Sequence, residues 1–197
     1  MAGRYAGTRT TNTYAFLYEG ARRAIEKAEA EQEGQFYEVL NTLVLSAFTI
    51  EAYLNHLVDK VSDFAPHLIL QKDLGQKSVW VKYKILRQAC NLGSGGLEAQ
   101  YPALAEALQF RNKMAHGRTE TIHFNENIDA DEPPCSTTIA SPEWQSFAVL
   151  SNAQLVFNQM KEMVTELHKA AGIGSFPFNL LGTGLFSFEL RSEPTNQ

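Results

Sequence analysis

The sequence predicts an all-α protein, an antiparallel bundle of four to five helices. Three observations predict it: long amphipathic segments make up most of the chain, few segments alternate as strands do, and 44% of the 197 residues are hydrophobic. That apolar content is enough for one real core. We expect one helical domain over residues 1–171, followed by a Phe/Gly-rich tail over residues 172–197.

The first two helices are predicted from apolar residues at helical spacing. Residues 13–31 form the first, and residues 37–61 form the longest and most apolar one. Gly34 lies between them and is expected to close the first helix, because glycine suits the end of a helix. The apolar stripe of the longer helix contains Leu40, Leu43, Val44, Ala47, Ile50, Leu54, Leu57 and Val58.

The middle of the chain carries two more predicted helices. Residues 63–77 form a connector, after which Ser78 is a suitable N-cap for the third helix. The glycine-rich segment 91–96 lacks the lysine and the spacing of a phosphate-binding loop, so it is interpreted as a flexible connection. The fourth helix covers residues 102–116, since Pro102 suits the first turn.

The last third of the chain alternates between polar and apolar segments. Residues 118–142 are a long polar excursion within the domain, with a short extended piece expected at 121–124. Pro142 is expected to begin one final long helix that runs through Leu167. In the tail, apolar residues alternate near the C-terminus, so a short β-hairpin can form around residues 182–184.

Charge and composition limit the possible functions. The net charge is -5 and the isoelectric point is about 5.6, so a nucleic-acid partner would have to use a local basic patch. The candidate RNA-phosphate contacts are Lys82, Lys84, Arg87, Lys113 and Arg118. The alternative interpretation of these residues is a solvated helix face.

Other sequence features indicate a cytoplasmic protein without a cofactor. Cys90 and Cys135 lie in unrelated contexts and are interpreted as reduced thiols. Residues 172–188 carry no charge, but proline and glycines interrupt them, so we expect no membrane-spanning helix. The polar loop around His123 lacks the ligand spacing of a zinc or calcium site, and we expect neither a metal nor a cofactor.

Two charged residues lie within the apolar stripes. Arg111 falls among the apolar residues of the fourth helix, and Glu51 among those of the second. A lone buried charge costs several kcal/mol, so we expect the two to pair between adjacent helices. The pair would aim the guanidinium; the alternative is a structural salt bridge and nothing more.

The residues after Arg111 extend this polar group. Asn112 and His116 are spaced i and i+4 and share one edge of the helix. An arginine, an amide and a histidine can hold a phosphodiester, stabilise its extra negative charge and move a proton. The alternative is that His116 and Gly117 only end the helix, where histidine and glycine are both favoured.

These residues carry a resemblance to a known family. Residues 111–116 (RNKMAH) resemble the signature of HEPN domains, an arginine followed by a polar residue and, a few positions on, a histidine. Residues 46–55 (SAFTIEAYLN) resemble the second helix of that family, including its acidic residue. The likeness spans residues 13–167 in helix order, and it implies an antiparallel HEPN-like helical bundle.

The resemblance implies a metal-independent endoribonuclease that acts as a homodimer. In that reading His116 handles the proton of the ribose 2′-OH or of the leaving 5′-oxygen, and Arg111 stabilises the pentacovalent phosphorane. Asn112 orients a phosphate oxygen or the histidine, and Glu51 orients Arg111. The products would be a 2′,3′-cyclic phosphate and a 5′-OH. The resemblance also implies that the protein acts as a toxin or antiphage-defence effector and has an antitoxin or a defence-system protein as its partner.

Two alternatives remain beside this interpretation. Some HEPN domains are non-catalytic and bind a partner protein or a nucleotide, and a plain helical scaffold could dock through its Phe-rich tail. One variant of the family is regulated through a tyrosine two residues beyond the histidine. Arg118 occupies that position here, so regulation by that route is not expected.

Overall fold

The computed structural model describes residues 4–9, 11–66, 73–123, 141–174, 176–178 and 186–191, with residues 4–9 and 186–191 as backbone only. These residues form a helical bundle with one small sheet, so the predicted all-α class is confirmed. The elements in chain order are β1 (Arg4–Arg9), α1 (Thr13–Ala30), α2 (Gln35–Asp59), α3 (Val61–Phe64), the 3-10 helix η2 (Leu74–Gln76), α4 (Val79–Ala89), α5 (Leu97–Gln100), α6 (Pro102–Ala115), α7 (Glu143–Phe147), α8 (Leu150–Ala171) and β2 (Phe186–Arg191).

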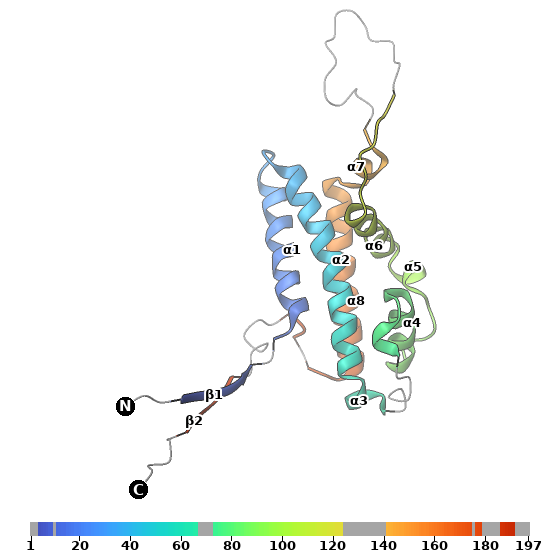
Figure 1. Ribbon diagram of the computed structural model, residues 1–197. Coiled ribbons are helices and arrows are strands. Elements are labelled where there is room, and N and C mark those ends of the chain that lie inside the picture. The colour runs from blue at the N-terminus through green and yellow to red at the C-terminus, as the bar shows by residue number, and fades with distance from the viewer. Residues whose placement is uncertain are drawn as a thin grey trace, which may run out of the picture.

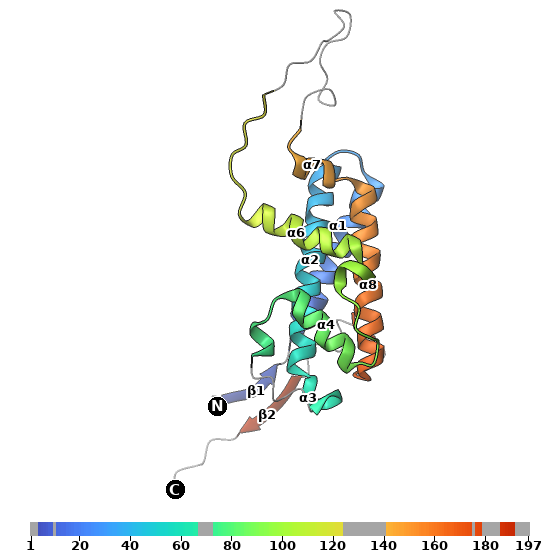
Figure 2. The ribbon, with the colours of Figure 1, turned by 90° about the vertical axis from the view of Figure 1, so that its right-hand side faces the viewer.

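Helix α2 is the centre of the bundle. It contacts α1 and α8, with which it forms a layer of long helices, and also α4 and α6, which cover its other side (Figures 1 and 2). Leu43, Ile50, Leu54 and Leu57 of α2 are completely buried. Burial of each such side chain stabilises the fold by about 1.5–3 kcal/mol, so α2 and its neighbours form one cooperative core.

The long helices do not all alternate in direction. Helices α1 and α2 are antiparallel, whereas α8 runs in the same direction as α2, because α4 and α6 return the chain between them (Figure 1). Gln154 near the start of α8 accordingly donates a hydrogen bond to Glu29 at the end of α1, at 2.7 Å. This order places α6, which carries the motif, across the face of α2 (Figure 2).

The predicted helix boundaries are confirmed where local signals are strong. Ser78 is the N-cap of α4, although its side chain makes no capping hydrogen bond, and Pro102 is the first residue of α6. Gly34 has another role than the one predicted. Helix α1 already ends at Ala30, and Gly34, with φ of 74°, precedes α2 instead.

The prediction of one continuous final helix from Pro142 is wrong. The chain turns between α7 and α8, where Val149 is extended with φ -117° and ψ 153°. Asn152 Nδ2 donates to the Phe147 carbonyl at 3.0 Å and so satisfies an oxygen that the break leaves without a helical partner. The break lets the Phe147 ring pack on Phe110, with centroids 5.2 Å apart. Tertiary packing here overrides local helix propensity.

The two ends of the described chain form an antiparallel ribbon. Strand β2 pairs with β1, from Arg4 opposite Arg191 to Arg9 opposite Phe186. A strand near the C-terminus was predicted, but its partner is the N-terminal segment instead of a second strand of the tail. The predicted turn at residues 182–184 lies outside the described residues. Residues 121–123, expected to be extended, are in no sheet of the described chain.

The segment after α8 returns to the bundle. Phe178 stacks on Tyr18 of α1, with centroids 3.8 Å apart and an interplanar angle of 19°. Most of the polar excursion, residues 124–140, lies outside the described residues. None of the helices in the described part combines the length and the apolar character that crossing a bilayer needs.

Candidate functional site

The predicted ion pair between α2 and α6 is present. Arg111 Nη2 donates to Glu51 Oε2 at 2.5 Å, and the guanidinium carbon lies 5.3 Å from the centre of the Phe48 ring. The side chains are 18% exposed for Arg111 and 37% exposed for Glu51. The pair is therefore at the edge of the bundle, where water reaches the carboxylate, and not in the core.

Arg111 retains unused hydrogen-bonding capacity. Its Nε is buried and has no hydrogen-bond partner among the described residues. A guanidinium carries five N–H donors and stays charged at every physiological pH. The contacts with Glu51 and Phe48 therefore fix the side chain and leave donors of the guanidinium unused, while the Nε itself is covered by protein atoms.

The other two motif residues lie at the exposed end of α6. His116 is the C-cap of the helix, and its backbone N–H donates to the Asn112 carbonyl at 3.1 Å. Both side chains are exposed, and within the described ranges neither has a side-chain hydrogen-bond partner. Both side chains are therefore free to meet a ligand.

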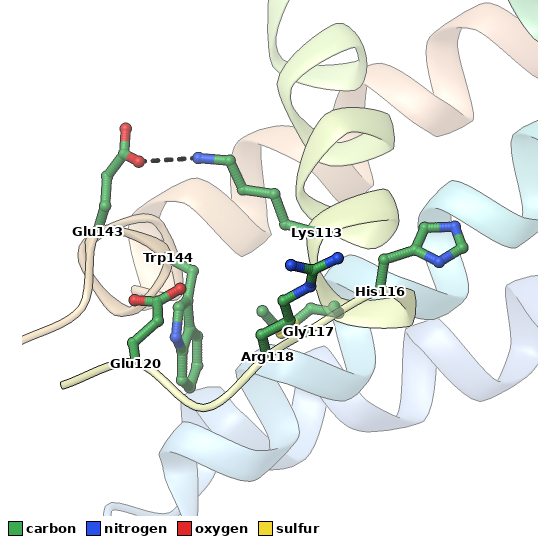
Figure 3. Close-up of a pocket in the computed structure, with 8 residues that line it drawn as sticks. Lys113, His116, Gly117, Arg118, Glu120, Glu143 and Trp144 are labelled. Atoms are coloured by element: carbon green, nitrogen blue, oxygen red, sulfur yellow. Dashed lines mark hydrogen bonds and ion pairs between the residues drawn. The ribbon is translucent and has the colours of Figure 1, made fainter.

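A single chain does not bring the imidazole and the guanidinium together. Five residues along a helix correspond to a rotation of about 140°, so Arg111 faces α2 while His116 faces elsewhere. Figure 3 shows the imidazole directed away from Trp144 and Glu143, on the other side of the helix end. The cavity that the His116 residue lines does not include Arg111 or Asn112, so the catalytic assignment of these three residues stays a prediction.

A cavity of about 350 Å³ opens at the end of α6. His116, Arg118, Glu120, Glu143 and Trp144 contribute to its lining, and neither Arg111 nor Asn112 does (Figure 3). The cavity was not predicted, because Trp144 reaches it from α7, a helix that exists only through the break before α8.

One ion pair joins the two helices that line the cavity. Lys113 Nζ and Glu143 Oε2 are 2.9 Å apart and join the end of α6 to α7 (Figure 3). Both side chains are exposed, so solvent screens the pair and it contributes little to stability. It does neutralise Lys113, one of the predicted phosphate contacts, in the free protein.

Two other predicted RNA contacts are buried, and their prediction is wrong. Lys82 is 5% exposed and donates to Asn55 Oδ1 at 2.6 Å. Arg87 is 8% exposed and donates to Glu166 Oε2 at 2.8 Å. Both belong to α4 and turn towards the bundle instead of water. Of the predicted set, Lys84 and Arg118 are exposed and have no ion-pair partner in the described part of the chain.

Arg87 is part of a polar cluster that sequence reasoning missed. Glu166 Oε2 also accepts a hydrogen bond from the Tyr101 hydroxyl at 2.9 Å, and Arg87 Nη1 donates to the Tyr83 hydroxyl at 3.3 Å. Burial, followed by the hydrogen bond to Glu166, raises the pKa of Tyr101. The cluster ties α4 to α8, and no local signal predicts a contact between residues so far apart in sequence.

Two histidines lie in an aromatic cluster near the other end of α2. The His56 ring is 5.0 Å from Tyr14, and the His168 ring is 6.2 Å from Tyr53. Burial lowers the pKa of both histidines; Lys60 lowers that of His56 further, and His56 that of His168. His168 Nδ1 and the Tyr53 hydroxyl are buried without a hydrogen-bond partner among the described residues.

The described residues include no group of three or more His, Cys, Asp or Glu side chains arranged to hold a metal ion. Comparisons of this chain with protein-family models, with curated proteins and with solved structures gave no match. The resemblance to HEPN domains therefore rests on the residues of α2 and α6 themselves.

Proposed function

We propose that the protein is a metal-independent endoribonuclease of the HEPN type that acts as a homodimer. It would cleave RNA by attack of the ribose 2′-OH and leave a 2′,3′-cyclic phosphate and a 5′-OH. The observation that carries the proposal is the pair of Arg111 with Glu51. It holds a permanent cation with unused donors beside the helix end where Asn112 and His116 are exposed.

Each side chain has a defined task in this reaction. The Arg111 guanidinium stabilises the charge that builds on the equatorial oxygens of the phosphorane. His116 takes the proton of the 2′-OH or gives one to the leaving 5′-oxygen, for which an imidazole is suited because its two ring nitrogens can accept and donate a proton. Asn112 orients a phosphate oxygen or the imidazole. DNA would not be cut, because it lacks the internal nucleophile.

The proposal requires a second copy of the chain. Because Arg111 and His116 of one chain diverge, a complete site needs Arg111 from one protomer and His116 from the other. Phe48, next to Arg111, is 39% exposed and offers an apolar contact on this surface. Two-fold symmetry would then create two equal sites, each with one Arg111 and one His116.

The biological setting belongs to the same proposal. An RNA-cleaving dimer of this kind would act in the cytoplasm as a toxin or antiphage-defence effector, held in check by an antitoxin or a defence-system partner. The competing proposal is a non-catalytic HEPN module that binds a partner protein or a nucleotide. The divergence of Arg111 and His116 within one chain favours that alternative if the protein is a monomer.

Cleavage is tested with purified protein, single-stranded RNA and a chelator. We expect products with cyclic phosphate and 5′-OH ends, and their loss in His116→Ala with unchanged helicity and melting temperature. His123→Ala is the matched control, because His123 is an equally exposed histidine outside the motif. Intact RNA with the unaltered protein, or equal cleavage by His116→Ala, would favour the binding-module alternative.

Mixing two inactive variants tests the shared site. Neither His116→Ala nor Arg111→Gln alone should cleave RNA. After subunit exchange, half of the dimers are mixed and each holds one intact site, so roughly a quarter of the original activity should return. If the mixture stays inactive while size measurements show mixed dimers, Arg111 and His116 do not act across the interface.

A further inference from the structure

The cavity at the end of α6 has a lining that suits a nucleobase better than a phosphate. Its volume, about 350 Å³, lies within the range of small-ligand sites. Two carboxylates, Glu120 and Glu143, line the cavity beside two cations, Lys113 and Arg118, so the lining has no excess of positive charge that would favour a phosphate inside it. The indole of Trp144 adds a flat apolar wall, on which a base can stack whatever its identity.

The indole is held in place before any ligand arrives. Trp144 is half-buried, and its ring lies 6.2 Å from that of Phe36 at the start of α2. The ion pair of Lys113 with Glu143, the residue before it, is exposed and joins α7 to the end of α6. A pre-positioned aromatic ring loses little conformational freedom on binding, which favours its use as a stacking platform.

The groups around the indole are complementary to a nucleotide. Figure 3 shows the Glu120 carboxylate on one side of the Trp144 ring and the Arg118 guanidinium on the other. Glu120 is exposed and has no partner within the described ranges, so it can accept hydrogen bonds from a base. Arg118 is also exposed and without an ion-pair partner there, so it can meet the phosphate of the same nucleotide.

We propose that this cavity binds the base of a nucleotide adjacent to the cleaved bond in single-stranded RNA, an inference that rests on the proposed function. The base stacks on Trp144, its exocyclic amine donates to Glu120, and Arg118 contacts its phosphate. Cytidine, which presents an amine, is therefore bound better than uridine, which does not. His116 contributes to the cavity wall while its imidazole points to the other side, which sets the reacting phosphate next to this nucleotide and not within the cavity.

The geometry also selects the state of the RNA. A base can stack on Trp144 only when it is unpaired and turned out of its own stack. The same bases in an A-form duplex keep their amines in base pairs, so Glu120 cannot read them. Duplex RNA of equal length is therefore the negative probe.

Binding is measured by tryptophan fluorescence, separately from cleavage. The chain has two tryptophans, and Trp80→Phe leaves Trp144 as the only one. The probes are 2′-O-methyl oligocytidine and oligouridine, which lack the nucleophile and stay intact. We expect the cytidine probe to quench Trp144 emission and to bind more tightly than the uridine probe, and the duplex to leave the emission unchanged.

Two further variants assign the contacts. Glu120→Gln in the Trp80→Phe background should remove most of the preference for cytidine. Glu106→Gln, an exposed glutamate on α6 outside the cavity, should keep it. By an independent measure such as anisotropy, Trp144→Ala should weaken binding about 5- to 100-fold, the loss expected for one base–aromatic stack. Trp144→Phe should retain much of the affinity and the packing on Phe36.

The outcomes separate this inference from the proposed function. Quenching by the probes without cleavage of unmodified RNA would refute the nuclease and keep the base-binding cavity. A different result would refute the cavity and keep the nuclease. In that case the protein cleaves RNA, the probes do not change Trp144 emission in the Trp80→Phe protein, and Trp144→Phe and Trp144→Ala keep the KM of the unaltered enzyme. Equal quenching by the duplex, or failure of the cytidine probe to bind, would also overturn the inference.

Discussion

A double-mutant cycle on Glu51 and Arg111 measures how strongly α2 and α6 are coupled. Glu51→Gln removes the carboxylate that Arg111 contacts at 2.5 Å and leaves a guanidinium whose side chain is only 18% exposed. Exposed pairs contribute about 0.2–1 kcal/mol, and breaking a buried pair costs about 3–5 kcal/mol. Because Glu51 is 37% exposed, the pair lies between these limits. We expect Glu51→Gln to lower the free energy of unfolding by about 1–2.5 kcal/mol.

The second variant and the double variant complete the cycle. Arg111→Met removes the cation and leaves a carboxylate that water can reach, so its cost should be smaller, about 1 kcal/mol. The double variant should be no less stable than Arg111→Met, which gives a coupling energy of about 1–2.5 kcal/mol. The coupling should fall as salt is raised, because the pair is partly open to solvent.

Urea unfolding followed by circular dichroism gives each free energy, with the m-value as a check on the denatured state. Arg23→Met is the matched control, because Arg23 also pairs with a glutamate at 2.8 Å but is 75% exposed; its effect should stay within about 0.5 kcal/mol. A coupling energy below about 0.5 kcal/mol would refute the reasoning that this pair holds the guanidinium in place. It would also weaken the proposed catalytic role.

Three further predictions concern stability, each followed by the same unfolding measurement. Glu166→Gln should cost about 2–3 kcal/mol, because it leaves the Arg87 side chain, 10% exposed, without its carboxylate. Gly172→Ala should cost about 1 kcal/mol from backbone strain alone, since φ is +66° and an added Cβ would meet nothing within 4 Å. Burial of His168 and His56 lowers both pKa values below that of the unfolded chain, about 6.5, so stability should be full above that pH and fall as pH drops towards the folded values.

Each of these predictions has a control. Gly75→Ala should cost nothing comparable, because the space beside it is equally open and its φ is not positive. His168→Phe should reduce the loss of stability between neutral pH and pH about 5, where carboxylates are still mostly ionised. An unchanged pH dependence of stability in His168→Phe would contradict the argument from the histidines. The other two arguments would be contradicted if Gly172→Ala did not change the free energy of unfolding, or if Glu166→Gln changed it by less than about 0.5 kcal/mol.

Much of the fold was predictable because its signals are local. The periodicity that predicted helices over residues 13–31 and 102–116 depends only on residues within a few turns. The pair of Glu51 with Arg111 was also predictable, because an isolated charge within each apolar stripe requires a partner of opposite sign. Periodicity is less reliable at the end of α6, where Ala115 continues the apolar spacing of the helix but is exposed, whereas Phe110, outside that spacing, is only 4% exposed.

By itself, then, the sequence determined the helices, their amphipathic faces and the existence of one charged pair between two of them. Only the tertiary structure decided that α4 turns Lys82 and Arg87 inward, that the last helix breaks before Leu150 and that the chain ends pair as a ribbon. It also decided that His116 leaves α6 on a different side from Arg111. The physical reason is that these features depend on how whole helices rotate and pack against distant neighbours, which local spacing does not encode.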